Sequence, residues 1–254
     1  MRRAVLVLTV VLMAVPAWAE HPSEEGAPEG RFHLIHDMGE VLTFTWGGAQ
    51  TAFALPTLTY LLPTAAVVGG SSFADGQVQA HFKGHDAHDG LARAGEISSY
   101  LYYGPVQAGI YMAGELADDP KLSATGKKAL ASLLGTQSII QPLKYLTRRR
   151  RPDGSNRQSF PSAGAGAASS ITPAVYHEYG LVPATVTAGS AAFIGFSRIY
   201  GNQHHLSDVL AGYAIGVGWG ILVETYERHQ SRWALVPMSE GRTMAGLALH
   251  LRFD

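Results

Sequence analysis

The chain has 254 residues, of which 46% are hydrophobic and 15% charged, and its formal net charge is −1. A chain of this length can bury one sizeable core, so one main domain is the default expectation. The near-zero charge argues against a nucleic-acid partner, which is usually bound by a clear excess of basic residues. Because there is no cysteine, disulfides and thiolate metal sites are excluded.

The N-terminus has the pattern of a secretory signal peptide. Two arginines precede the apolar stretch 4–14, and a small-x-small triplet ends at Ala19. The apolar stretch is short for a membrane span, which favours cleavage after Ala19 over a retained anchor. We therefore expect residues 1–19 to be removed and the exported chain to work in the periplasm.

The region after the signal peptide is predicted to be mainly helical. The polar stretch 20–30 is followed by a short amphipathic pattern over 32–46, and the charge-free run 51–70 is long enough to span a membrane although two prolines interrupt it. Periodicity does not distinguish a spanning helix from a buried one in that run. Apolar residues at helical spacing predict further helices over 91–116, 123–143, 162–176, 181–196 and 206–226.

The C-terminal tail changes to an alternating pattern, which is typical of a strand. Apolar residues alternate with other residues over 247–253, and the stretch 233–238 is suited to pair with them across a turn. We expect an all-α, multi-helix bundle, to which a small C-terminal β-hairpin is a candidate addition. The expected divisions are a signal peptide (1–19), a polar N-terminal segment (20–46), a helical domain (47–228) and a tail (229–254).

One polar stretch, 197–208, lies directly before a long apolar helix. If that helix begins near residue 205, His204 and Asp208 lie about one turn apart on one face. A carboxylate there can accept the N–H of one imidazole nitrogen and leave the other free to attack. Arg198 adds a permanent cation suited to an oxyanion such as phosphate. A capped helix terminus is the competing explanation.

Two further stretches have a similar ambiguity. The basic run 144–152 ends an apolar helix, where cations often only offset the helix dipole. Ser162 begins a helix of small residues, either as a simple cap or as part of an anion cradle with the following backbone N–H groups.

Together the stretches resemble the type 2 phosphatidic acid phosphatase and vanadium haloperoxidase superfamily, over roughly residues 91–228. The first motif, Lys-x6-Arg-Pro, is matched by Lys144, Arg151 and Pro152, and the third, Ser-Arg-x5-His-x3-Asp, by residues 197–208. The resemblance implies an all-α bundle. It also implies a reaction through a phosphohistidine that needs no cofactor or metal. Its implied residues are a nucleophile and its orienting partner (His204, Asp208) and phosphate-binding residues (Lys144, Arg151, Ser162, Ala163, Gly164, Arg198).

The second motif departs from the family's Pro-Ser-Gly-His pattern. Pro161-Ser162 is followed by Ala163-Gly164-Ala165. Whether Gly164 takes the histidine's place, or Ala165 does with one residue inserted, the histidine that protonates the leaving oxygen in the family is absent. General acid help is worth about 10²- to 10⁴-fold and matters most for poor leaving groups. Candidate replacement acids are His205, His177 and the His85/His88 loop.

Three functions remain open from the sequence. The first is an exported phosphatase, impaired by the missing histidine, that acts on phosphomonoesters or diphosphates of small molecules or lipids. The second is an inactive family member that binds phosphate or phospholipid headgroups, and the third is a vanadate-binding peroxidase relative. Both a soluble and a membrane-associated periplasmic protein fit the sequence. The loop 81–89, rich in His and Asp, is a candidate metal site, for which a solvated loop is the competing explanation.

Overall fold

The computed structural model describes residues 34–52, 55–230, 233–240 and 243–251. The expected signal peptide and the segment 20–33 lie outside the described residues. The described helices are α2 (Leu34–Ala52), α3 (Leu55–Ser71), the 3-10 turn η1 (Ser72–Ala74), α4 (Asp75–His81), α5 (Gly90–Leu101), α6 (Pro105–Leu116), α7 (Pro120–Thr147), α8 (Ala163–Ser169), α9 (Thr172–Tyr179), α10 (Leu181–Tyr200) and α11 (Leu206–Gln230).

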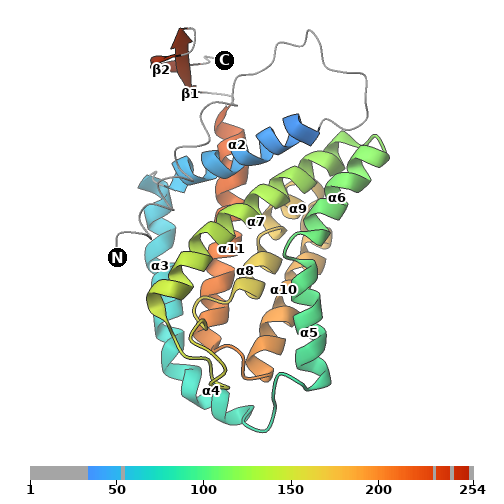
Figure 1. Ribbon diagram of the computed structural model, residues 1–254, viewed down its shortest axis with the longest axis vertical. Helices are drawn as coiled ribbons and strands as arrows, with labels where there is room; N and C mark the ends of the chain where they lie inside the picture. The colour runs from blue at the N-terminus through green and yellow to red at the C-terminus, as the bar shows by residue number, and fades with distance from the viewer. Residues whose placement is uncertain (1–33, 53–54, 231–232, 241–242, 252–254) are drawn as a thin grey trace.

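The predicted all-α bundle is confirmed. In Figure 1, α7, α10 and α11 run along the molecule and enclose the short α8, while α2 crosses them near one end. The loop that follows α7 and the short α4 lie at the opposite end. The C-terminal hairpin is present as β1 (Trp233–Glu240) and β2 (Thr243–Leu251), which pair antiparallel.

Two predicted helices are in fact broken. The expected helix over 91–116 is divided into α5 and α6, because Gly104 has a φ of 141° and Pro105 occupies the first turn of α6. A positive φ and a proline together begin a new helix rather than continue the old one. The expected helix over 162–176 is likewise divided into α8 and α9, with a proline in the first turn of α9.

The long helix α7 runs from one end of the bundle to the other (Figure 1). Asp119 caps its N-terminus by accepting hydrogen bonds from the amides of Lys121 and Leu122, each at 3.0 Å. The helix ends where Arg148 adopts a left-handed conformation with a φ of 46°. The basic run of the first motif therefore begins on the last turn of α7 and continues into the loop beyond it.

The core is built largely from small residues around α8, every residue of which is buried. A Cβ on Gly212 of α11 would lie 2.4 Å from the carbonyl oxygen of Ser162, and one on Gly216 would lie 2.3 Å from that of Gly166. The two glycines therefore let α11 approach the backbone of α8 directly. This contact fixes the start of α11, which carries Asp208 of the third motif, against the start of α8, which carries the second.

Candidate active site

His204 lies in the buried loop between α10 and α11, where its ring is held by the backbone. Its Nδ1 lies 2.7 Å from the carbonyl oxygen of Ser159, which can only accept, so the proton is on Nδ1 and Nε2 carries the lone pair. Burial lowers the pKa of His204 to about 4, and the charges of Lys144 and Arg151 act in the same direction. The imidazole is therefore neutral at physiological pH and suited to nucleophilic attack through Nε2.

Asp208, in the first turn of α11, contributes to the site mainly by fixing the surrounding loops. Its Oδ2 lies 3.8 Å from His204 Nδ1, and accepts hydrogen bonds from the Ser159 hydroxyl at 2.5 Å and the His205 amide at 2.8 Å. Burial acts to raise the pKa of Asp208, but these donors and the neighbouring His204 hold it at about 2. The Ser159 carbonyl oxygen is thus the direct acceptor that sets the His204 tautomer. Asp208 orients Ser159 by accepting a hydrogen bond from its hydroxyl.

Arg149 ties this arrangement to α4. Its Nη1 donates to Asp208 Oδ1 at 2.7 Å and to the Ser207 hydroxyl at 2.6 Å, while its Nη2 donates to Asp75 Oδ2 at 2.6 Å. Asp75 also accepts the Ser207 amide at 2.9 Å. One guanidinium therefore joins two buried carboxylates from helices far apart in the sequence.

Three cations of the first and third motifs lie within electrostatic reach of one another. Burial lowers the pKa of Lys144 to about 8, and the charge of Arg151 lowers it further. Lys144 Nζ donates to the carbonyl oxygen of Gln158 at 2.7 Å. Arg198 donates to Gln203 and, at 3.3 Å, to the Ser99 hydroxyl. Like charges held this close favour the binding of a polyanion.

Several buried polar atoms of the site have no hydrogen-bond partner within the described part of the chain. They include Nε of Arg151, Nε of Arg198 and the hydroxyl oxygen of Ser162. A buried unpaired donor costs about 1–3 kcal/mol, so each of these atoms needs an explanation, and a ligand that accepts from it is one. Two guanidinium N–H groups and a hydroxyl are the donors that a phosphoryl group accepts from.

The second motif opens α8, and its histidine position is filled by a neighbouring helix. Ser162 is the N-cap residue and its carbonyl oxygen accepts the Gly166 amide at 3.1 Å, with Ala163 and Gly164 in the first turn. A Cβ on Gly164 would lie 3.1 Å from Cβ of Ser99 on α5. The helix α5 therefore packs closely against the point from which the family's histidine would project.

Of the histidine alternatives for that role, His177 and His85 pair with carboxylates, whereas Nδ1 of His205 is buried without a hydrogen-bond partner among the described residues. The ring of His205 faces the carbonyl oxygen of Arg150, at 3.3 Å from Nε2. His177 pairs with Glu224 at 3.1 Å. Glu224 lies sixteen residues after Asp208 on α11, which places it about 24 Å further along the helix. His85 pairs with Asp89 at 2.8 Å and stacks on the ring of Tyr200.

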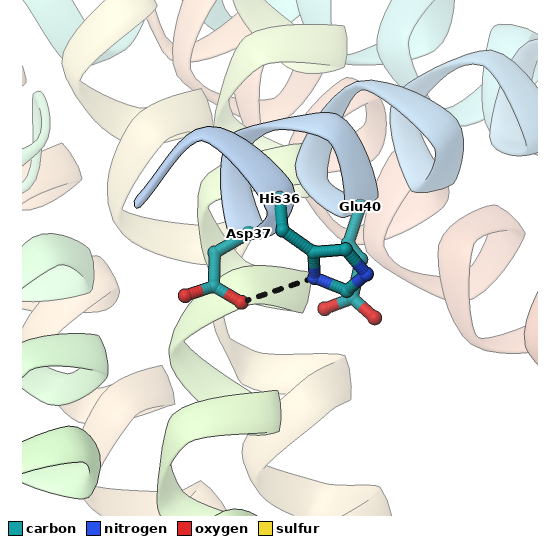
Figure 2. Close-up of side chains that lie close together, drawn as sticks. All are labelled: His36, Asp37 and Glu40. Carbon is teal, nitrogen blue, oxygen red and sulfur yellow. Dashed lines mark ion pairs between the residues drawn. The ribbon is translucent and has the colours of Figure 1, made fainter. Parts of the chain in front are cut away.

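Figure 2 shows another group of ligand-type side chains, His36, Asp37 and Glu40, in the first turns of α2. Both carboxylates already share a lysine, because Lys127 Nζ lies 3.2 Å from Asp37 and 2.5 Å from Glu40. Asp37 also accepts the Tyr111 hydroxyl at 2.6 Å. These contacts fasten α2 to α6 and α7, so the group is explained by packing. A similar set, His177, Glu178 and Glu224, surrounds the buried Lys128.

Sequence reasoning missed three residues that organise the site, namely Asp75, Arg149 and Ser159. Arg149 lies inside the basic run, where nothing distinguishes it from the exposed Arg148 and Arg150. Asp75 is more than 130 residues from its partner Ser207, so no local pattern indicated it. Ser159 lies two residues before Pro161, but its function depends on a backbone carbonyl, which every residue has.

Comparison with known proteins agrees with this site. The sequence profile of the PAP2 superfamily matches residues 126–232, which contain both intact motifs and the altered one. The match covers 107 of the 254 residues, and over this part the chain is similar to the PAP2 superfamily.

The chain is also similar to a lipid A 1-phosphatase of Porphyromonas gingivalis, with 37% identity over 98 residues. The match covers 36% of this chain and spans 22% of the length of that protein. Among solved structures, the chain is similar to a transmembrane PAP2-type phosphatidylglycerolphosphate phosphatase from Bacillus subtilis. That similarity has a TM-score of 0.45 and 19% identity, and it covers 76% of this chain and 96% of the other.

Proposed function

We propose that the protein is an exported phosphatase that hydrolyses phosphate monoesters or diphosphates, including lipid-linked ones, through a phosphohistidine. The observation that carries the proposal is His204, buried and neutral, with its Nδ1 proton directed to the Ser159 carbonyl. Around it are the unpaired donors of Arg151, Arg198 and Ser162. A fixed nucleophile beside unpaired anion-binding donors is the arrangement that phosphoryl transfer requires.

In the first step, Nε2 of His204 attacks phosphorus as the bond from phosphorus to the leaving oxygen breaks. The developing positive charge on the imidazole is offset by the nearby Asp208 carboxylate. Lys144, Arg151 and Arg198 balance the charge on the three phosphoryl oxygens. Water then attacks the phosphohistidine, the phosphorus–nitrogen bond breaks, and inorganic phosphate leaves with neutral His204 restored.

A lipid-linked substrate is supported by a groove beside the site and by the similar proteins. The groove, with a volume of about 360 Å³, lies between α5 and α10. It is lined by Ser98, Leu101, Tyr102, Ser190, Phe193 and Ile194 among others. Ile194 is also the neighbour that a Cβ on Gly164 would meet at 3.8 Å, so the groove adjoins the second motif. The similar protein from Porphyromonas gingivalis is described as acting on lipid A, a phosphorylated lipid.

We further propose that the protein acts outside the cytoplasm in association with a membrane. Apolar side chains are exposed along α3 and α10, including Leu62 at 76% and Val182 at 77%. Apolar faces of this extent are typical of contact with lipid or a partner protein. Within the described helices, one stretch, Leu206–Tyr226 of α11, is long and apolar enough to cross a membrane, and half of it is buried in the bundle. Protein that carbonate releases from cell membranes is soluble or loosely attached, whereas protein that only detergent releases is membrane-bound.

A second candidate function is binding without turnover. The observation that favours it is Gly164, which stands where the family's general acid would be. In that case the donors would hold a phosphate or a phospholipid headgroup, and bound phosphate or vanadate would raise the unfolding temperature.

One set of assays distinguishes the two functions. Purified protein and the His204→Ala variant are incubated with p-nitrophenyl phosphate, a lipid phosphate and an isoprenyl diphosphate, and released phosphate is measured. We expect turnover by the wild type that the variant lacks, together with a phosphoenzyme that is labile in acid. Equal rates for the two proteins on every substrate would remove the phosphatase proposal, and protection by phosphate would then favour binding alone.

A further inference from the structure

The helix α5 brings a carboxyl group to the altered part of the site. Glu96 lies three residues before Ser99, so both project from one face of α5. Ser99 contacts the Gly164 position at 3.1 Å and accepts a hydrogen bond from Arg198, while Glu96 Oε1 lies 3.9 Å from Nη1 of the same arginine. Glu96 therefore lies one helical turn from Ser99, the residue that faces the Gly164 position, and both lie near Arg198.

The surroundings of Glu96 suit a proton donor. Its side chain is about one-third exposed, so it can exchange protons with solvent. The Tyr100 hydroxyl donates to Oε1 at 3.2 Å and restricts the carboxyl position. The charged or titratable groups that act on Arg198 at this point are Glu96, Tyr103, Arg151 and Tyr100.

We propose that Glu96 is the general acid of this protein, replacing the histidine missing from the second motif. This inference rests on the proposed phosphatase function. As Nε2 of His204 forms its bond to phosphorus, the Glu96 carboxyl proton passes to the leaving oxygen, which departs as an alcohol. Glu96 is left as a carboxylate and regains its proton from solvent in the next cycle.

The test is the dependence of kcat/KM on the leaving group. This ratio reports only steps up to departure of the leaving group, so slow hydrolysis of the phosphohistidine does not affect it. Glu96→Gln keeps the shape of the side chain but removes its acidic proton. We expect kcat/KM to fall about 10²- to 10⁴-fold for an alkyl phosphate and roughly tenfold or less for p-nitrophenyl phosphate, whose leaving group needs little protonation.

Controls separate a catalytic role from a structural one. Glu96→Asp keeps an acid with a shorter reach and should fall between wild type and Glu96→Gln on the alkyl phosphate. Glu115→Gln, a carboxyl loss on α6, should change both substrates equally or not at all. Retained protection by vanadate shows that Glu96→Gln is folded with its phosphate site intact.

The failure of the Glu96 role and the failure of the phosphatase function give different results. If wild type turns over p-nitrophenyl phosphate in a His204-dependent way, but Glu96→Gln affects both substrates by the same factor, Glu96 only holds Arg198 and this inference is wrong. If no substrate is turned over in a His204-dependent way, the phosphatase proposal fails, and the role of Glu96 fails with it.

Discussion

The replacement of Lys144 by methionine is expected to make the ligand-free protein more stable at neutral pH. Lys144 is 6% exposed, and burial and Arg151 lower its pKa to about 8, against 10.5 for an unperturbed lysine. Each pKa unit corresponds to about 1.4 kcal/mol, so holding the charged form in the fold costs about 3 kcal/mol at pH 7. Methionine removes that cost in a similar volume, but it also loses the hydrogen bond to the Gln158 carbonyl, worth about 1 kcal/mol.

The expected net gain for Lys144→Met is therefore about 2 kcal/mol at pH 7. The sign with pH follows from linkage. Because the folded pKa lies below the unfolded one, the unfolded chain holds more protons between pH 8 and 10.5, and wild-type stability rises through that window. At pH 9.5 the wild type should have recovered about 2 kcal/mol, and the difference between the two proteins should nearly vanish.

The measurement is urea-induced unfolding of both proteins at pH 7 and pH 9.5, with and without phosphate. Phosphate should stabilise the wild type and have less effect on Lys144→Met, because the variant lacks one cation of the site. A variant less stable than wild type at pH 7, or a difference in stability that does not change with pH, would refute the reasoning. In either case Lys144 would not be a strained cation kept for an anion.

Three further predictions follow from the described contacts. Arg149→Ala leaves two buried carboxylates unpaired and should lower the free energy of unfolding by about 3–5 kcal/mol, whereas Arg150→Ala at an exposed position should change it by less than about 0.5 kcal/mol. Gly126→Ala should cost about 3 kcal/mol, because its Cβ would lie 2.3 Å from a backbone nitrogen of α6. Gly218→Ala meets open space in a helix and should stabilise by about 0.5–1 kcal/mol. For catalysis on p-nitrophenyl phosphate, whose leaving group needs little protonation, kcat/KM should fall below about pH 4, as His204 gains a proton, and above about pH 8, as the buried lysine of the site loses one.

The predictions for the arginine and glycine variants are measured by chemical unfolding, and the prediction for kcat/KM is measured by a pH–rate profile. Equal effects of the two arginine variants would contradict the bridging role of Arg149, and equal effects of the two glycine variants would contradict the close contact between α6 and α7. An acid limb near pH 6.5 in kcat/KM would mean that the nucleophile is not desolvated as the buried His204 is.

Local signals in the sequence were enough for most of the fold. The apolar period predicted helices in the regions of α7, α10 and α11, and the alternation near the C-terminus predicted a hairpin. The two errors came from extending apolar periodicity through local breaks. Gly104-Pro105 was a readable signal for the first, whereas the second break, between α8 and α9, lies in a run of small residues with no equally clear marker before Pro173.

What the sequence by itself predicted was the candidate nucleophile, the candidate phosphate-binding cations and the altered second motif, because each depends on residue types at fixed short spacings. Only the tertiary structure decided how they are held. The Ser159 carbonyl, not Asp208, accepts the His204 proton at hydrogen-bond distance, and Arg149 joins Asp208 to Asp75 across 133 residues of chain. It also brought Glu96 of α5 beside Arg198 of α10, 102 residues away. Such contacts depend on which helix faces pack together, and no spacing along the chain encodes them.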